Sequence, residues 1–510
     1  MARVITPSYI LTLRLKTNNS DVSILNKRME IGRYLYNSVV GITMKRVRTM
    51  FQSKEYTNLR KELKELNKEY RNAKDRKNKK SLDKLRKAKY KELEKIYKSY
   101  NLDEYSLINS MTPLYKSFNK NIDNKTAQAI GSRAWKSFDK LLNGNGEKVY
   151  FKKRGEFHSL EGKWNKSGMR YLEDKGVISW NKLKIPVIVK HNDLYAQKAL
   201  QDRVKYCRIL RKEIKGKIVF YVQLILEGIP PIKVNKETGE VKSLGIGNVG
   251  IDIGTRTIAV SSKQDVKLME LAPSIEVSDK KIKFIQRKMD RSRRINNPNK
   301  YNENGTIKKG NRDKWIYSNR YLKLKALRKE LFRKQTILRK QDHEIMSNYI
   351  LSLGDRFLVE EMNFKGLQAR AKKTTVNEKT GKINKKKRFG KSLSNKAPSM
   401  LLSIINRKLA YEKLNLIEIN TKKVKASQFN HFTGEYHKKE LKDRWNENIQ
   451  IQRDMYSAFL IMNVTNDLET IDRDLCFKTY DNFKQLHDKE IKRLTKLKDR
   501  GCKMLSSMGI

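Results

Sequence analysis

The chain has 510 residues, of which 114 are Lys or Arg and 55 are Asp or Glu, so its formal net charge at pH 7 is +59. Such a charge would weaken a compact monomer through self-repulsion unless a polyanion neutralised it, and its spread along the whole chain favours long tracks of phosphate contacts over one basic tail. The length predicts two to four domains, and with the strand-rich segments it favours a nucleic-acid enzyme over a ribosomal or membrane-surface protein.

Cysteine use and hydropathy indicate the compartment. Cys207, Cys476 and Cys502 are too few for a disulfide framework, which fits a reducing cytosol. The N-terminal stretch MARVITPSYILTLRLK alternates apolar and polar residues and lacks the apolar core of a signal peptide. The sequence has no run of about 18 apolar residues that could span a membrane. We therefore expect a soluble, cytoplasmic protein.

The N-terminal part begins with a predicted strand over residues 4–16 and continues with helical periodicity from about residue 24 to residue 140. The polar interval 72–80 predicts a turn that brings one long helix back along the next. The lysine-rich face of this hairpin is either simply solvated or binds nucleic acid, and the sequence favours neither reading. Apolar residues recur at three-to-four spacing on both sides of the turn, at Leu59, Leu63, Leu66, Tyr70, Leu82, Leu85, Leu93 and Ile96.

Strand signals return after residues 143–155, as β-branched and aromatic runs with short polar breaks. The pair Gly216-Lys217 is predicted as the hairpin turn between the last two runs. Together with the N-terminal strand, these runs predict a small antiparallel barrel interrupted by the helical insertion, followed by a linker from Pro230 to Ser243. The runs cover residues 177–180, 183–189, 205–214 and 217–226.

The stretch GNVGIDIGTRTIAVSS, residues 247–262, places one acid in the most strand-like part of the chain. Asp252 has apolar neighbours on both faces of its strand, which is typical of a central strand in a covered sheet. An ionised carboxylate there is costly without a partner, so we expect it to lie at an edge or to bind a cation. The following GTRT predicts a tight turn and a return strand.

The C-terminal half alternates basic helices with short apolar strands. A strongly basic helical segment over residues 276–350 is interrupted by a turn-rich loop at 296–311. The other predictions are a strand at 356–362, a mobile basic loop at 372–391, a helix at 399–414, a strand at 414–420 and a helix at 455–464.

Three acids that are separated in the sequence could converge on one oxygen-lined site. Besides Asp252, the pair Glu360-Glu361 ends a predicted strand, and Asp454 opens a helix, where a carboxylate also favours the helix dipole. Each acid alone has an ordinary explanation, such as a turn residue or an N-cap. Together they suit Mg²⁺, which takes carboxylate, water and phosphate oxygens as ligands. Two ions roughly 3.5 to 4 Å apart would activate a water and stabilise the leaving oxygen of a phosphodiester.

Three segments resemble the RuvC motifs of the TnpB family, which are transposon-encoded RNA-guided nucleases related to compact type V CRISPR effectors. These segments are GIDIGTRTIAVSS, FLVEEMNFKGL and QRDMYSAFLIMN. VYFKKRGEFHSL resembles a segment ahead of the family's nuclease domain, and the basic helices between residues 280 and 340 resemble its bridging region. The resemblance implies a multidomain α/β fold, with an RNase H-like (RuvC) nuclease domain built on a mixed sheet with helices on both faces. It also implies an antiparallel β-barrel (wedge) domain interrupted by a helical recognition insertion.

The resemblance also implies domain boundaries. The barrel would comprise residues 1–24 and 141–245, the helical recognition domain 25–140, the nuclease domain 246–475 and a C-terminal helical tail 476–510. Within the nuclease domain, the bridging helices would span 276–350, and a cysteine-free remnant of a zinc-ribbon region would span 421–450.

By position, Asp252, Glu360 and Asp454 match the family's catalytic and metal-binding acids. The family's second motif usually has Glu followed by Asp, whereas here Glu361 follows, and the strand pleat would turn Glu361 to the opposite face. The implied cofactor is Mg²⁺, as two ions that Mn²⁺ could replace. The residues expected to bind nucleic acid are Lys152, Lys153, Arg154, Arg287, Arg291, Arg293, Arg294 and Arg453.

One departure from the family concerns zinc. The family generally carries a zinc ribbon with two CxxC pairs before the third motif, but the corresponding residues 425–445 contain no cysteine. His431 and His437 are the only conventional zinc-ligand candidates there, and two histidines do not close a tetrahedral structural site. We therefore predict no zinc and interpret both histidines as surface residues of a loop that binds target nucleic acid.

The implied function is that of an RNA-guided DNA endonuclease of the bacterial or archaeal cytoplasm, associated with the nucleoid. It would bind a guide RNA, recognise a short motif beside the target DNA and cut with one metal-dependent site, while base pairing supplies sequence specificity. One alternative is a nuclease-silent RNA-guided repressor, against which the three acids argue. The other is an unguided RuvC-type nuclease, which would leave residues 1–245 without a role.

Overall fold

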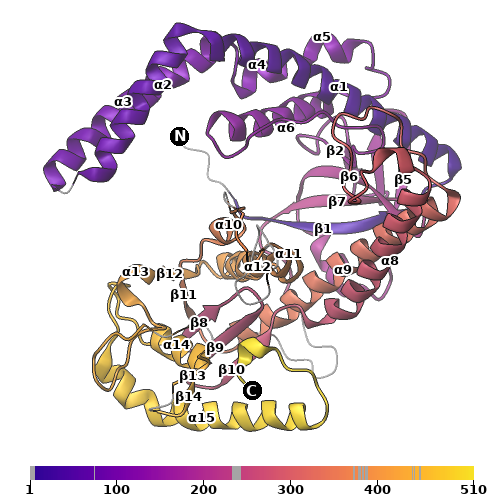
Figure 1. The fold of residues 1–510 in the computed structure, drawn as a ribbon. Helices are drawn as coiled ribbons and strands as arrows, with labels where there is room; N and C mark the ends of the chain where they lie inside the picture. Colours follow the sequence, from indigo (N-terminus) through magenta and orange to yellow (C-terminus); the bar gives the residue numbers. More distant parts are fainter. Residues whose placement is uncertain are drawn as a thin grey trace. The chain divides into compact units, whose positions relative to one another are not determined.

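The computed structural model describes residues 6–73, 75–232, 243–371, 374–376, 381, 384, 389–438, 440, 443–446 and 449–510. Its contacts divide the chain into two compact units, Met1–Pro231 and Ile232–Ile510 (Figure 1). The division falls at the start of the predicted linker, of which residues 233–242 lie outside the described part.

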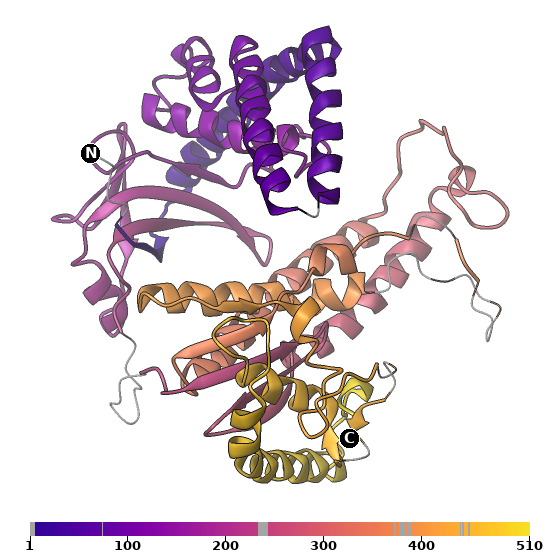
Figure 2. The same ribbon diagram turned by 90° about the vertical axis from the view of Figure 1, so that its left-hand side faces the viewer.

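Unit 1 is built on a seven-stranded antiparallel sheet in the order β2-β6-β7-β1-β5-β4-β3. The predicted barrel is not closed: among the described residues, β2 and β3 are the two edges of a sheet that curls as a half-barrel (Figure 2). The strands are β1 (Ser8–Leu15), β2 (Ser159–Glu161), β3 (Arg170–Leu172), β4 (Val177–Trp180), β5 (Leu183–Ile188), β6 (Val204–Ile214) and β7 (Lys217–Glu227). Residues alternate strictly between exposed and buried along β1, as in a strand with one face on a core.

The β6–β7 hairpin turns one residue earlier than predicted. Ile214 pairs with Lys217, so Lys215 and Gly216 form the turn. Both have positive φ, 49° at Lys215 and 78° at Gly216, which is the combination that a two-residue type I′ turn requires.

A run of helices separates β1 from β2 in the sequence. The first starts at a capping box, in which the Asn18 side chain accepts a hydrogen bond from the Asp21 amide and the Asp21 carboxylate accepts one from the Asn18 amide. The predicted helical hairpin is α2–α3, and the ion pair between Lys89 and Glu62, at 3.0 Å, joins its two helices. The helices of unit 1 are α1 (Asn19–Gln52), α2 (Lys54–Asn72), α3 (Arg76–Ser99), α4 (Glu104–Asn109), α5 (Met111–Lys116), α6 (Asn124–Leu142) and α7 (Leu194–Ala199).

Unit 2 contains a five-stranded mixed sheet in the order β10-β9-β8-β11-β12. β8, β9 and β10 are antiparallel neighbours, whereas β8, β11 and β12 run parallel. β8, which carries Asp252, is the central strand that its apolar neighbours predicted. The strands are β8 (Asn248–Ile253), β9 (Thr257–Ser262), β10 (Val266–Glu270), β11 (Arg356–Glu360) and β12 (Ile417–Ile419), with a separate pair β13 (Trp445–Asn446) and β14 (Ile451–Gln452).

Helices cover both faces of this sheet (Figure 1). On one face Ile251 and Val359 pack with apolar residues of α9 and α12. On the other face Ala259 and Leu358 pack with residues of α14 and α15. The helices of unit 2 are α8 (Glu276–Ile295), α9 (Asn319–Leu351), α10 (Phe364–Leu367), α11 (Gly390–Lys396), α12 (Pro398–Tyr411), α13 (Thr421–Val424), α14 (Arg453–Met462) and α15 (Arg473–Asp499).

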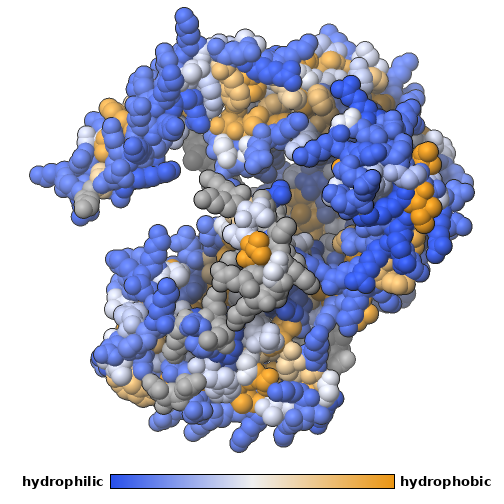
Figure 3. Space-filling model, viewed as in Figure 1, coloured by the Kyte–Doolittle hydropathy of each residue, from blue (hydrophilic) through white to orange (hydrophobic). Residues whose placement is uncertain are grey.

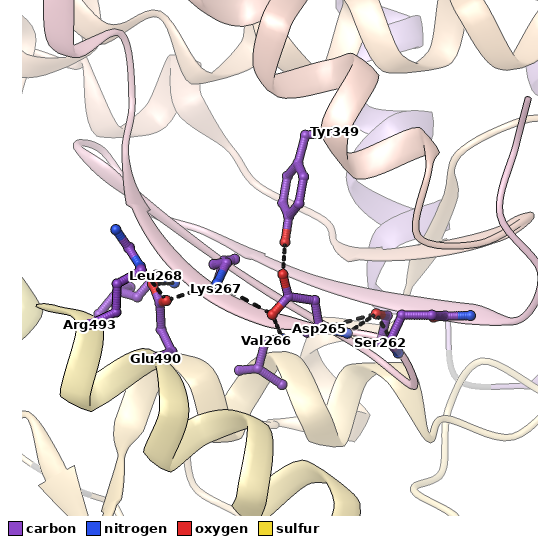
Figure 4. A network of polar contacts seen from close by, with 9 residues as sticks. Ser262, Asp265, Val266, Lys267, Leu268, Tyr349, Glu490 and Arg493 are labelled. Carbon is purple, nitrogen blue, oxygen red and sulfur yellow. Dashed lines mark hydrogen bonds and ion pairs between the residues drawn. The ribbon is translucent and has the colours of Figure 1, made fainter. Parts of the chain in front are cut away.

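A polar network fixes α15 against the sheet (Figure 4). Glu490 of α15 is fully buried and pairs with Lys267 of β10 at 3.1 Å and with Arg493 at 2.6 Å. Lys267 also lies 3.4 Å from Asp265, which accepts a hydrogen bond from the Tyr349 hydroxyl of α9 at 2.9 Å. A buried carboxylate is tolerated only with such partners. Because one partner of Glu490 lies on β10, the helix predicted as a C-terminal tail packs against the sheet of unit 2.

Some predicted segments lie partly outside the described residues. Most of the basic loop predicted at 372–391 does, as do residues 439, 441–442 and 447–448 of the segment 421–450 and the start of the strand predicted at 4–16. In the described part of the chain, no helix is both long and apolar enough to cross a membrane.

Candidate active site

Strand register brings Asp252 and Glu360 together. β11 pairs with β8 in parallel, with Leu358 beside Gly250 and Val359 beside Ile251. One step further in the same register, Glu360 lies beside Asp252, and neighbouring strands are about 4.8 Å apart. Because side chains alternate between faces, both carboxylates lie on the sheet face where Leu358 packs toward α14.

Helix α14 brings Asp454 to the same face. The α14 backbone lies so close to β8 that a Cβ atom at Gly250 would overlap the Ala458 carbonyl oxygen, and the Asn248 side chain donates a hydrogen bond to the Met462 carbonyl at 3.3 Å. The helix therefore runs antiparallel to β8. Asp454 precedes Ala458 by one turn, about 6 Å of helix, and Asp252 follows Gly250 by about 6.6 Å of strand, so the two acids lie at the same end of the crossing.

The start of α14 is fixed by its cap and by the β13–β14 pair. The Gln452 side chain accepts a hydrogen bond from the Met455 amide at 2.8 Å, so Gln452 is the N-cap and Asp454 lies in the first turn, where its charge favours the helix dipole. The Arg453 amide donates to the Arg444 carbonyl at 2.8 Å. This places the Arg444 guanidinium 3.8 Å from the Asp454 carboxylate.

Burial raises the pKa of all three acids, and repulsion from the other two carboxylates adds to the shift of Asp252. The pKa of Asp252 lies well above the ordinary range, and burial is the main cause. The carboxylates of Asp454 and Glu360 raise it further, whereas the guanidinium groups of Arg453 and Arg444 lower it. Burial also raises the pKa of Glu360 and of Asp454, the latter against the effect of the same two arginines. These carboxylates therefore hold protons more tightly than free acids, because burial disfavours their charged forms more than the two arginines favour them.

The donor chemistry fits a hard divalent cation. Among the described residues, no three His, Cys, Asp or Glu side chains come close enough to enclose one ion. Mg²⁺ does not need such a cage, because it usually keeps several waters and binds through one or two carboxylates and substrate phosphate. Asp252 and Glu360, adjacent in register, would supply the protein oxygens, with Asp454 next to them.

Two features of this site escaped the sequence-based prediction. Gly250 was not recognised as the point where α14 crosses β8, although a glycine inside a strand can mark close backbone approach. Arg444 was not predicted beside Asp454, because its position depends on the two-residue strands β13 and β14, which are too short to show a pattern.

The predicted nucleic-acid-binding residues of unit 1 lie on an exposed segment. Lys152, Lys153 and Arg154 all expose their side chains. The Lys152 backbone is held by the Asn37 side chain, which accepts from its amide at 2.8 Å and donates to its carbonyl at 2.9 Å. The segment is thus anchored to α1 through its backbone, which leaves the cationic side chains available.

The predicted residues on α8 differ in their surroundings. Arg287 and Arg291 are exposed. Arg293 lies over the Trp315 ring at 5.3 Å and Arg294 over the Tyr301 ring at 5.1 Å, so both help to hold the loop between α8 and α9. Hydrophilic side chains cover most of the molecular face drawn in Figure 3, as the composition predicts.

His431 is buried, which contradicts its interpretation as a surface residue. Its ring lies 4.0 to 5.8 Å from those of Phe432, Tyr456, Phe459, Phe477 and Tyr480, and its Nδ1 lies 2.6 Å from the Tyr456 hydroxyl. Burial lowers the pKa of His431 to about 4. The prediction failed because these rings come from α14, α15 and a loop, which the local sequence does not reveal. His437 is exposed and lies 3.0 Å from Glu435.

No protein-family model and no curated protein matches the chain. Solved structures that resemble it include "Cryo-EM structure of the Cas12f1-sgRNA-target DNA complex", with 11% identity over 90% of this chain and 99% of that chain and a TM-score of 0.41. Another is "Cryo-EM structure of CRISPR-Cas12f Ternary Complex", with 14% identity over 89% of this chain and 99% of that chain and a TM-score of 0.22. TM-scores this low do not establish a shared fold.

Proposed function

We propose that this protein is an RNA-guided DNA endonuclease with a single RuvC-like site formed by Asp252, Glu360 and Asp454. The observation that carries the proposal is the convergence of three carboxylates, two from parallel strands and one from a helix start, on one sheet face with raised pKa values. The mixed sheet with helices on both faces is the architecture that an RNase H-like domain implies. The order of the three motifs supports a relation to the TnpB family.

The chain's own residues would prepare the site for a phosphodiester. Asp252 and Glu360 would present adjacent oxygens from the sheet, and Asp454 would lie next to them at the start of α14. Arg444 and Arg453 lower the proton affinity of Asp454 and Asp252, which favours the ionised, ligand-competent state. Bound Mg²⁺ or Mn²⁺, proposed as two ions, would supply Lewis-acid stabilisation of the reacting phosphate and a more acidic water.

The proposed partners are a guide RNA and a target DNA. The net charge of +59 supports a polyanionic partner, and the exposed cations of residues 152–154 and of α8 offer phosphate contacts. Base pairing would then provide sequence specificity, and unit 1 would recognise the duplex and the adjoining DNA motif by backbone and shape. The expected location is the bacterial or archaeal cytoplasm.

The test of this function begins with the RNA that co-purifies with the protein. That RNA would be sequenced, and a plasmid matching its variable part, placed beside a randomised flanking sequence, would be incubated with the complex and Mg²⁺. We expect cleavage of the matched plasmid only, with enrichment of one flanking motif. Equal cutting of matched and unmatched plasmids would favour the unguided nuclease, and binding of the matched plasmid without cutting would favour the repressor.

A further inference from the structure

A hollow of about 550 Å³ lies where α1 meets α2 in unit 1. Its lining combines two aromatic rings, two hydroxyl groups and three cations, with no carboxylate. The lining residues are Phe51, Tyr56, Thr57, Arg60, Lys61 and Lys64. None of them belongs to the candidate active site, and none was predicted as a binding residue.

Ser53 forms the junction between α1 and α2 beside this hollow. Ser53 ends α1 and caps α2, with an extended backbone (φ −70°, ψ 140°) and a side chain that accepts a hydrogen bond from the Tyr56 amide at 3.3 Å. The resulting bend stacks the Phe51 ring on the Tyr56 ring, with centroids 5.1 Å apart and planes 24° apart. The Phe51 side chain nevertheless remains 43% exposed.

The cations lie on the same helical face as Tyr56. Arg60 and Lys64 follow Tyr56 at spacings of four residues, which places the three on one face of α2, whereas Leu59 and Leu63 are buried on another face. Arg60 lies close enough to the Tyr56 ring to oppose the rise in its pKa that burial causes. Within the described part of the chain, Arg60 and Lys64 form no ion pair, in contrast to neighbouring Glu62, which is paired with Lys89 of α3.

We propose that this hollow binds one unpaired nucleotide of a nucleic-acid strand, with the base on the Phe51–Tyr56 pair and the phosphates on Arg60, Lys61 and Lys64. Aromatic rings beside cations are the combination with which proteins hold unpaired bases without sequence preference. The site adds a contact that the proposed nuclease function does not require. The strand could be a guide RNA or a single-stranded DNA segment, because both offer the same base and phosphate chemistry.

The test uses the purified full-length chain and short single-stranded DNA and RNA oligonucleotides that carry one 2-aminopurine. Stacking on an aromatic ring quenches the fluorescence of this base. We expect Phe51→Ala to weaken binding about tenfold, which equals about 1.4 kcal/mol. The same variant should quench the fluorescence of the bound probe less than the wild type does. Phe51→Leu should resemble Phe51→Ala, because it keeps apolar bulk without a π-face, whereas Phe51→Trp should bind like the wild type. Tyr105→Ala is the matched control, since Tyr105 is 75% exposed in the same unit but lies outside the hollow.

A second pair of variants tests the cations. Arg60→Gln and Lys64→Gln should each make the dependence of log affinity on log salt shallower by about 0.7, the value for one phosphate contact on a single strand. Binding is measured without divalent cations, so failure of the proposed nuclease function would not affect this result. Preferential quenching of the RNA or the DNA probe would identify the strand that occupies the hollow. Wild-type affinity and quenching in Phe51→Ala, for both probes, would overturn the proposal.

Discussion

Gly250 of β8 and Ala458 of α14 are in such close contact that no side chain fits between them: a Cβ atom at position 250 would overlap the Ala458 carbonyl oxygen and the Met462 amide nitrogen. The overlapped atoms belong to a helix backbone and cannot rotate away. This contact sets the distance between the strand that carries Asp252 and the helix that carries Asp454.

Gly250→Ala should therefore displace α14 and separate the two acids. We expect a loss of about 1–3 kcal/mol in the free energy of unfolding, as for an overpacked core, together with a strong loss of DNA cleavage. Denaturant unfolding and a cleavage assay would measure the two effects. Gly41→Ala is the matched control, because a Cβ there meets its nearest atom at an ordinary 3.9 Å, and alanine in place of glycine inside a helix should stabilise by about 0.5–1 kcal/mol. A Gly250→Ala protein with wild-type stability would show that α14 lies further from β8.

Asp252→Asn should stabilise the protein in the absence of divalent cations. The raised pKa of Asp252 means that the folded state binds its proton more tightly than the unfolded state, so stability falls as the pH rises from the ordinary carboxyl range through the raised pKa. Above that window the variant should melt at a higher temperature than the wild type, by about 2–4 °C for each kcal/mol of relieved repulsion. Melting curves between pH 4 and 8 would measure the difference.

Divalent cations should reverse this ranking. Adding Mg²⁺ or Mn²⁺ should raise the melting temperature of the wild type, because a cation that binds only the folded state stabilises it, and should have little effect on Asp252→Asn. Equal effects on both proteins would place the cation elsewhere.

Glu360→Gln should reduce cleavage far more than Glu361→Gln. Glu360 lies in register beside Asp252 and has a raised pKa because of burial, whereas Glu361 follows the end of β11 and is exposed. Loss of a ligand or charge that acts on the reacting phosphate typically costs about 10²–10³ in kcat. Single-turnover cleavage by the two variants is the measurement, and the opposite ranking would mean that the register of β11 is shifted by one residue.

Elements with a long local pattern could be predicted from the sequence, whereas the pairing of short strands could not. The long alternating runs of β6 and β7, and the apolar run around Asp252, predict their strands because each pattern is local and repeats many times. The predicted antiparallel barrel is found as a curled half-barrel. Its incomplete closure could not be predicted, because closure depends on the edge strands β2 and β3, each of three residues, which carry too little pattern to reveal their pairing.

The same distinction applies to the candidate site. The acids could be named from motifs, but their approach depends on the Gly250 contact and on the β13–β14 pair. The burial of His431 depends on rings from elements distant in sequence, such as Tyr456 of α14 and Tyr480 of α15. Such long-range packing leaves no signature in the HFTGEYH segment.

His431→Phe should remove a source of acid instability. The pKa of His431 falls from 6.5 to about 4 through burial, so the folded state binds this proton less tightly and loses stability as the pH falls from 6.5 toward 4, by at most about 3 kcal/mol. The variant keeps a ring in the aromatic environment and should show a flatter dependence of unfolding free energy on pH. Elemental analysis should find less than one zinc per chain in both proteins, and a stoichiometric zinc that the variant loses would make His431 a ligand.

The central claim is that the acids cut the DNA that basic residues and a guide RNA bind, and Asp252→Ala separates these two tasks most directly. The variant and the wild type, each loaded with the same guide RNA, would be titrated with matched DNA for affinity and then supplied with Mg²⁺ for cleavage. We predict that Asp252→Ala binds guide and target with nearly wild-type affinity and that its cleavage is abolished. Cleavage at the wild-type rate would contradict the account, because Asp252 would then have no part in the chemistry.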